Sequence, residues 1–183
     1  MERAEIIPSL LQNPLLFYSY DIQEGDTPEI VANKYYGDPY RYWMVLLCNQ
    51  IIDPQWNWPL TSQQLDLYLT DKYSVAASSN NVLSYIQATI QEYRLSSTST
   101  DSVSSITTST TIVIDKSVYD TFRTGTSKVA FPSGATVTRV YTKEAVSIYN
   151  YEIELNEAKR NINLIDKKYA AEFEKQLVSL LGR

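Results

Sequence analysis

The chain has 183 residues, of which 44% are hydrophobic and 20% charged, so it can bury a core in one large domain or two small ones. Sixteen Lys and Arg against twenty-one Asp and Glu give a net charge of −5, which argues against duplex nucleic acid or an anionic membrane as the main partner. The lack of histidine, the single cysteine and the lack of an apolar run of about 18 residues exclude histidine-based catalysis, an intramolecular disulfide and a transmembrane helix.

Residues 1–16 predict an extended arm. Pro8 and Pro14 interrupt this segment, and both a proline and the residue before it resist helical geometry. The arm carries four leucines, namely Leu10, Leu11, Leu15 and Leu16. These leucines either pack on the chain's own body or fill a groove of a partner, so they are interface candidates.

A strand and a helix are predicted after the arm. Alternating residues favour a strand over residues 17–22. Asp26 and Glu29 have the spacing of a capping box, and Pro28 falls in the first turn, where its missing N–H costs nothing. The helix that starts there should end at Gly37.

Two more helices and a tryptophan loop complete the front of the chain. Asp38-Pro39 repeats the order of cap and proline, which predicts a helix over 39–49 with Cys48 as a buried, unreactive thiol. A loop with Trp56 and Trp58 follows, and then a short helix from Thr61 or Ser62 to Tyr73.

The aromatic residues near this loop are the strongest candidates for a binding surface. The chain has fifteen Tyr and three Trp against four Phe, and Tyr and Trp suit protein interfaces. An extended loop would point Trp56 and Trp58 to one side. Three interpretations are open for these aromatic residues and Tyr40: a platform on which glycans stack, an anchor in a protein interface, or a plug packed beneath the third helix.

The second half of the chain predicts β-structure followed by a helix. Residues 82–93 fit either helix or strand, whereas thirteen of the eighteen residues in 95–112 are Ser or Thr, which favours exposed β-structure. A strand, a turn and a second strand are expected between Lys128 and Tyr141. A hairpin of strands 147–155 and 160–165 is preferred to one long helix over 152–181, because asparagine is a poor residue inside helices. The closing helix, about residues 166–181, carries Phe173 and Leu177 as interface candidates.

The front of the chain resembles a LysM domain. The resemblance is carried by YDIQEGDT at residues 20–27, YGD at 36–38 and Asn49. It implies a strand, two helices and a closing strand, but the usual closing strand is replaced here by WNWPL at 56–60. LysM relatives bind N-acetylglucosamine polymers, so a peptidoglycan- or chitin-binding module is the alternative function.

A narrower resemblance is to the small baseplate wedge protein of T-even-type contractile-tailed phages, the gene product 53 family. It is carried by YYGDPYRYWMVLLCN at 35–49, by DPQWNWPL at 53–60 and by parts of residues 151–162. This resemblance implies a structural virion protein of the tail baseplate, assembled in the bacterial host cytoplasm. It also implies partners, namely other wedge proteins that the subunit clamps as six wedges join around the central hub.

The sequence therefore predicts an α+β fold in three segments. They are the arm 1–16, a LysM-like β-α-α domain over 17–73, and a β-rich region over 74–183 that ends in the terminal helix. No catalytic, cofactor or metal site is expected, because no histidine, glycine-rich phosphate loop or Asp-x-Asp-x-Asp pattern is present. Nucleic acid, membrane and glycan are not expected as partners, and the opening residues do not have the order of a signal peptide.

Overall fold

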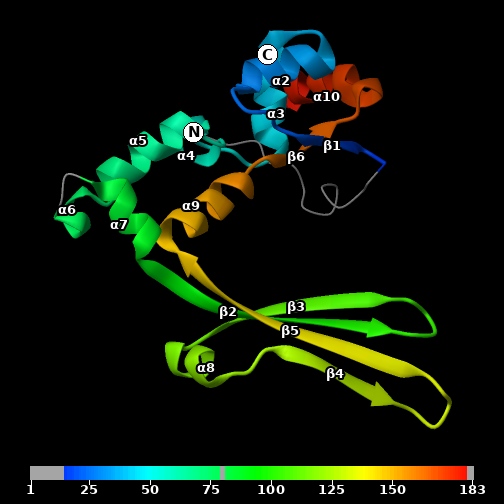
Figure 1. Cartoon of the computed structure of the whole chain (residues 1–183). Coiled ribbons are helices and arrows are strands. Elements are labelled where there is room, and N and C mark those ends of the chain that lie inside the picture. The colour runs from blue at the N-terminus through cyan, green and yellow to red at the C-terminus, as the bar shows by residue number, and fades with distance from the viewer. Residues whose placement is uncertain (1–14, 79–80, 181–183) are drawn as a thin grey trace. The chain divides into compact units, whose positions relative to one another are not determined.

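The computed structural model describes residues 15–78 and 81–180, and their fold is α+β as predicted (Figure 1). The chain forms two compact units. The first unit contains the residues up to Leu67 together with those from Glu154 onward. The second unit is Tyr68–Ile153.

The first unit pairs two strands and surrounds them with helices. Its elements are β1 (Phe17–Asp21), α2 (Pro28–Tyr36), the 3-10 helix η1 (Pro39–Arg41), α3 (Tyr42–Cys48), α4 (Pro54–Asn57), α5 (Ser62–Lys72), α9 (Ile148–Glu157), β6 (Asn161–Ile165) and α10 (Lys167–Leu180). The boundary between the units falls within α5 and within α9, so each unit contains a part of these two helices.

The second unit is dominated by an antiparallel sheet with the strand order β3-β2-β5-β4. The strands are β2 (Ile90–Asp101), β3 (Thr107–Ile114), β4 (Gly125–Ala130) and β5 (Thr136–Ser147). The helices that lie wholly in this unit are α6 (Ser74–Ala77), α7 (Val82–Ala88) and α8 (Lys116–Thr121). The Ser/Thr-rich segment therefore forms β-structure, as the sequence predicts. It is exposed in β3, whereas its residues in β2 are half-buried.

Helix α2 confirms the predicted helix but begins at a different cap. The N-cap is Thr27, whose Oγ1 accepts a hydrogen bond from the backbone N–H of Ile30 at 3.3 Å. Asp26, predicted as the cap, is instead buried and binds the side chains of Tyr20 and Lys34. Gly37 ends the helix in the left-handed conformation at φ 76°, which glycine adopts without a steric cost.

Residues 147–155 were expected to form a strand, and this expectation is wrong because they lie mostly in helix α9. The rival of one long helix is also wrong, because the chain leaves the helix after Glu157 and forms strand β6. The buried residues of α9 are Ile148, Glu152 and Asn156, spaced four apart, and two of them are polar. The spacing of apolar residues alone does not reveal this buried face, because two of its three members are polar and form hydrogen bonds with residues far along the chain.

Strand β6 pairs with β1, and this pairing joins the two ends of the chain. The strands run antiparallel from Phe17 opposite Ile165 to Asp21 opposite Asn161. Ile162 and Leu164 face inward while Asn161 and Asn163 are exposed, which gives β6 the period of a half-buried strand. The structural division therefore differs from the sequence-based one, because residues from 154 onward pack with the front of the chain.

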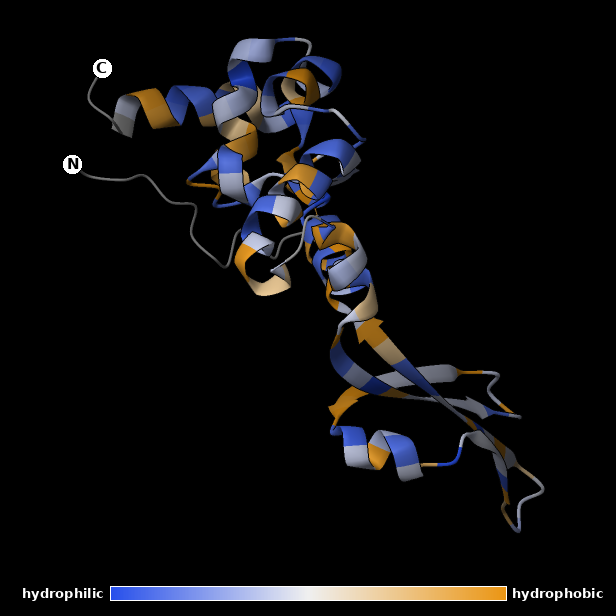
Figure 2. Cartoon of the chain, turned by 60° about the vertical axis from the view of Figure 1, so that its left-hand side comes forward, coloured by the Kyte–Doolittle hydropathy of each residue, from blue (hydrophilic) through white to orange (hydrophobic). Residues whose placement is uncertain are grey.

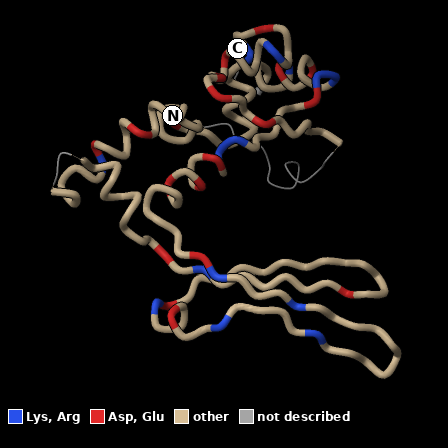
Figure 3. Tube along the Cα trace, in the orientation of Figure 1, with Lys and Arg blue, Asp and Glu red and all other residues tan. Residues whose placement is uncertain are grey.

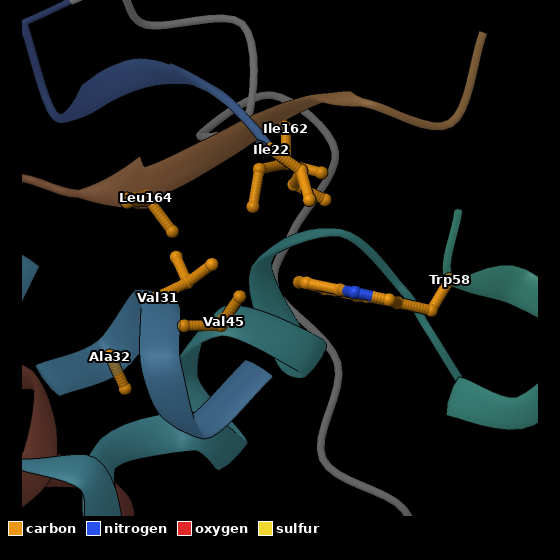
Figure 4. Packing of buried hydrophobic residues seen from close by; sticks show 7 residues of the cluster. All are labelled: Ile22, Val31, Ala32, Val45, Trp58, Ile162 and Leu164. Carbon is orange, nitrogen blue, oxygen red and sulfur yellow. The ribbon is translucent and has the colours of Figure 1, made fainter. Parts of the chain in front are cut away.

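The core of the first unit lies between this strand pair and helices α2 and α3. Figure 4 shows its buried side chains, which are Ile22, Val31, Ala32, Val45, Trp58, Ile162 and Leu164. Ile162 and Leu164 reach this cluster from β6, more than a hundred residues along the chain from the others. The first unit thus depends on residues from both ends of the chain.

Candidate interaction surfaces

Asp26 lies at the centre of a polar network in the turn between β1 and α2. The residue is 8% exposed, and its carboxylate accepts hydrogen bonds from Lys34 Nζ at 2.7 Å, the Tyr20 hydroxyl at 3.0 Å and the Gln23 backbone N–H at 3.3 Å. Burial raises the pKa of Asp26, but the hydrogen bonds from Lys34 and Tyr20 outweigh burial and hold this pKa below its usual value. The carboxylate is therefore a charged anchor of the fold.

The two tryptophans of the predicted loop have different environments. Asp53 begins α4 by accepting a hydrogen bond from the Gln55 backbone N–H at 2.9 Å, so Trp56 lies in a helical turn. Trp58 follows this turn in an extended conformation and enters the core, where it is 7% exposed. Its Nε1–H donates to the backbone oxygen of Asp26 at 2.6 Å. Trp56 and Trp58 therefore do not form the one-sided pair expected from an extended loop, and Trp58 has almost no surface to offer a partner.

Trp56 and Tyr40 are the exposed aromatic residues among the candidates of the first unit. Trp56 is 58% exposed and Tyr40 is 82% exposed. Hydrogen bonds hold both backbones, because Asp38 Oδ1 accepts from the Tyr40 N–H at 2.9 Å and Lys159, far along the chain, donates from Nζ to the Trp56 carbonyl at 2.9 Å. Large aromatic side chains on a fixed backbone suit contact with another protein, because little freedom is lost on binding.

The leucines of the arm are only partly covered by the structure. Leu10 and Leu11 lie outside the described residues. Leu15 is exposed, whereas Leu16 is half-buried and its carbonyl accepts a hydrogen bond from the Asp166 backbone N–H at 2.9 Å. The end of the arm is thus fixed beside the start of α10.

The two interface candidates of helix α10, Phe173 and Leu177, are both half-buried in the first unit. The Phe173 ring stacks on Trp43 of α3, with ring centroids 6.2 Å apart and an interplanar angle of 17°. Arg41 Nη2 donates to Glu174 Oε2 at 3.3 Å. Leu177 is half-buried. Phe173 therefore joins two helices of the same unit, and Leu177 keeps a part of its surface exposed.

Two pockets of the first unit lie among its described residues. A pocket of about 260 Å³ lies beside the turn from Gly25 to Thr27, and Asp26 is the one titratable residue that lines it. Another pocket, of about 250 Å³, is lined by carboxamides and by Lys159, which already binds the Trp56 carbonyl. Burial raises the pKa of Cys48 to about 12, so this thiol stays protonated at neutral pH.

Among the described residues no group of three or more Cys, Asp or Glu side chains could hold a metal ion. No helix in the described part of the chain is both long and apolar enough to cross a membrane.

The sheet of the second unit carries aromatic packing on one face. Tyr93 of β2 contacts Tyr119 of α8 with ring centroids 4.7 Å apart, and Phe122 contacts Tyr141 of β5 at 5.8 Å. Lys143 Nζ lies 4.6 Å from the centroid of the Tyr119 ring. Helix α8, which the sequence did not predict, therefore covers one end of this face.

The opposite face of the same sheet carries hydroxyl groups. Three pairs of Ser and Thr side chains bond across β2 and β3, at 2.8, 3.3 and 3.1 Å, and we call them the hydroxyl ladder: Ser96–Thr111, Thr98–Ser109 and Thr100–Thr107. Such cross-strand pairs stabilise a sheet on a face that is exposed to solvent. They explain how a low-complexity segment forms ordered strands.

The buried carboxylates of the described residues are thus engaged in holding the fold, and Tyr40 and Trp56 are exposed. A family model described as base plate wedge protein 53 matches residues 9–100, which is half of the chain. The chain therefore belongs to this family of phage proteins.

A relative from Enterobacteria phage T4 supports the same family. The T4 protein, baseplate wedge protein gp53, is 44% identical to this chain over 46 residues. The aligned residues are 25% of this chain and 23% of the T4 protein, so the similarity spans about a quarter of the relative's length.

Proposed function

We propose that this chain is a structural subunit of a phage tail baseplate, in which it joins neighbouring wedge proteins by static contacts. The observation that carries this proposal is membership of the base plate wedge protein 53 family over residues 9–100. The exposed Tyr40 and Trp56 lie inside this matched range. We infer that they are anchors of a contact shared across the family.

Adhesion without catalysis fits the chemistry of the described residues. The buried carboxylates Asp26 and Glu152 are both engaged, since Glu152 Oε1 accepts from Lys72 Nζ at 2.7 Å and from the Tyr73 hydroxyl at 2.6 Å. A general acid or base needs an open proton path to a substrate, and these groups are committed to the fold. In this proposal the subunit clamps other wedge proteins and helps six wedges to join around the hub.

Size-exclusion chromatography with isolated wedge proteins of the same phage tests the proposal. We expect the chain to co-migrate with at least one of them, and the double variant Tyr40→Ala/Trp56→Ala to lose this co-migration. Phe131→Ala is a matched control, because it removes an exposed aromatic side chain outside the matched residues and should leave binding unchanged. Failure of the wild-type chain to co-migrate with any wedge protein would overturn the proposed function.

A further inference from the structure

The outer edge of β3 presents an unpaired strand. The strand order places β3 at one end of its sheet, and in residues 15–78 and 81–180 no strand pairs with it on the side away from β2. Seven of its eight residues are exposed. Because an edge strand carries free backbone N–H and C=O groups, it can accept another strand.

Strand β3 also lacks the features that usually protect an edge. Charged residues, proline, bulges and short length are the common protections. The sequence of β3 is TTSTTIVI, and its register with β2 continues without a shift from Thr107 to Ile114. Figure 3 shows no charged residue along it, and Figure 2 shows it pale over the Ser and Thr residues and orange at the end next to α8. The other edge strand, β4, is shorter and carries Lys128 in its middle.

A second copy of the same strand is a compatible partner because β3 carries no charge. In a symmetric antiparallel pair the residues at the two-fold axis lie close to their own copies, so a charge near the centre of the strand would meet a like charge. The hydroxyl ladder already shows that these Ser and Thr side chains bond to one another across antiparallel strands. Repetition of such contacts on the free side requires no new chemistry.

We propose that β3 pairs antiparallel with β3 of a second copy of this chain, around a two-fold axis through Thr110. A two-fold axis perpendicular to a sheet must pass through a pair of identical residues, because residues directly opposite each other lie on the same face. An axis at Thr110 pairs the seven exposed residues, 107 to 113, and leaves out the half-buried Ile114, with Thr108 opposite Ile112 and Ser109 opposite Thr111. This pairing does not depend on the proposed baseplate role, so each can fail without the other.

Sedimentation velocity of the full-length chain over the micromolar range tests this pairing. We expect a monomer that shifts to a dimer as concentration rises. Thr110→Lys places two like charges opposite each other and should weaken the dimer by about fivefold. An equal mixture of Thr110→Lys and Thr110→Glu chains should restore it. Thr126→Lys, the same change on β4, is the matched control and should leave the dimer intact.

Cysteine cross-linking tests the register. Opposite residues of an antiparallel pair have Cα atoms about 4.5–5.5 Å apart, within the range of a disulfide. Because the native Cys48 is buried, Thr110→Cys introduces an accessible thiol and should give a disulfide-linked dimer on mild oxidation, whereas Thr126→Cys should not. A chain that stays monomeric at every concentration, or a dimer that Thr110→Lys leaves intact, would overturn the pairing.

Discussion

At the scale of single residues, Asp26 shows how a surface-type motif becomes a core feature. A Gly-Asp-Thr sequence before a helix predicts a cap, and the structure assigns that role to Thr27. Asp26 instead gathers Tyr20, Gln23 and Lys34 around one carboxylate. What separates the two roles is the bond to Lys34, which lies in α2 eight residues after Asp26, and local capping rules do not include such a partner.

Replacement of Asp26 by Asn should destabilise the first unit at neutral pH. The amide loses the charge that holds Lys34 and Tyr20, and hydrogen bonds to buried charges contribute about 1.5–3 kcal/mol. Because Lys34 is half exposed to water, we expect a loss of about 1–2 kcal/mol. Urea unfolding followed by tryptophan fluorescence measures this change.

The same variant has a defined pH dependence. The folded pKa of Asp26 is lowered, so its stabilisation is fully present above the unfolded pKa of about 3.9 and is lost as pH falls through the folded pKa. The stability gap between wild type and Asp26→Asn should therefore narrow as the pH is lowered below about 4. Asp21→Asn makes the same chemical change at an exposed position nearby and is the control. Its free energy of unfolding should stay close to that of the wild type at every pH. A gap that stays constant with pH would contradict the role of Asp26.

At the scale of elements, Asn156 ties helix α9 to the chain that leads into α5. Its Nδ2 donates to the Leu60 carbonyl at 2.9 Å, and its Oδ1 accepts from the Leu60 N–H at 2.8 Å. The side chain thus mimics the edge of a strand. This pair of bonds is the reason that a poor helix former occupies a helical position here.

Substitution of Asn156 by Ala should cost about 2–4 kcal/mol of the free energy of unfolding, because it leaves both backbone groups of Leu60 without these partners. Asn150→Ala lies in the same helix at an exposed position and should change stability by about 0.5 kcal/mol or less. Thermal or urea unfolding of the two variants side by side decides the matter. If both variants change the free energy of unfolding by the same amount, the hydrogen bonds to Leu60 do not stabilise the protein, and this account of Asn156 is wrong.

At the scale of the whole molecule, the first unit is built from both ends of the chain. The segment 17–73, predicted to be a domain in its own right, has part of its core supplied by β6. Ile162 and Leu164 are both buried there, and burial of an aliphatic side chain contributes about 1.5–3 kcal/mol. A small domain that loses such contacts has little stability in reserve.

A fragment of residues 1–73 should therefore fail to fold cooperatively. We expect weak far-UV circular dichroism, no near-UV signal from the tryptophans and no cooperative thermal transition. Addition of a peptide of residues 154–183 should restore part of the near-UV signal, because it supplies β6 and α10. A sharp melting transition of the fragment alone would contradict the discontinuous first unit.

The sequence by itself determined the features that depend on neighbours along the chain. Local spacing, caps and turn residues predict strand β1, helix α2 with its end at Gly37, helix α5, the Ser/Thr-rich strands and helix α10. The family motif at residues 35–60 was also visible there, because it is a continuous run of residues.

The tertiary structure decided whatever depends on partners far along the chain. It placed Trp58 inside and Trp56 outside, made a helix of residues 148–157 and paired β6 with β1. In each case a polar group is satisfied by a distant residue, such as Trp58 by Asp26 or Asn156 by Leu60. Local patterns carry no record of such partners, since a buried polar side chain looks exposed until the group that binds it is known.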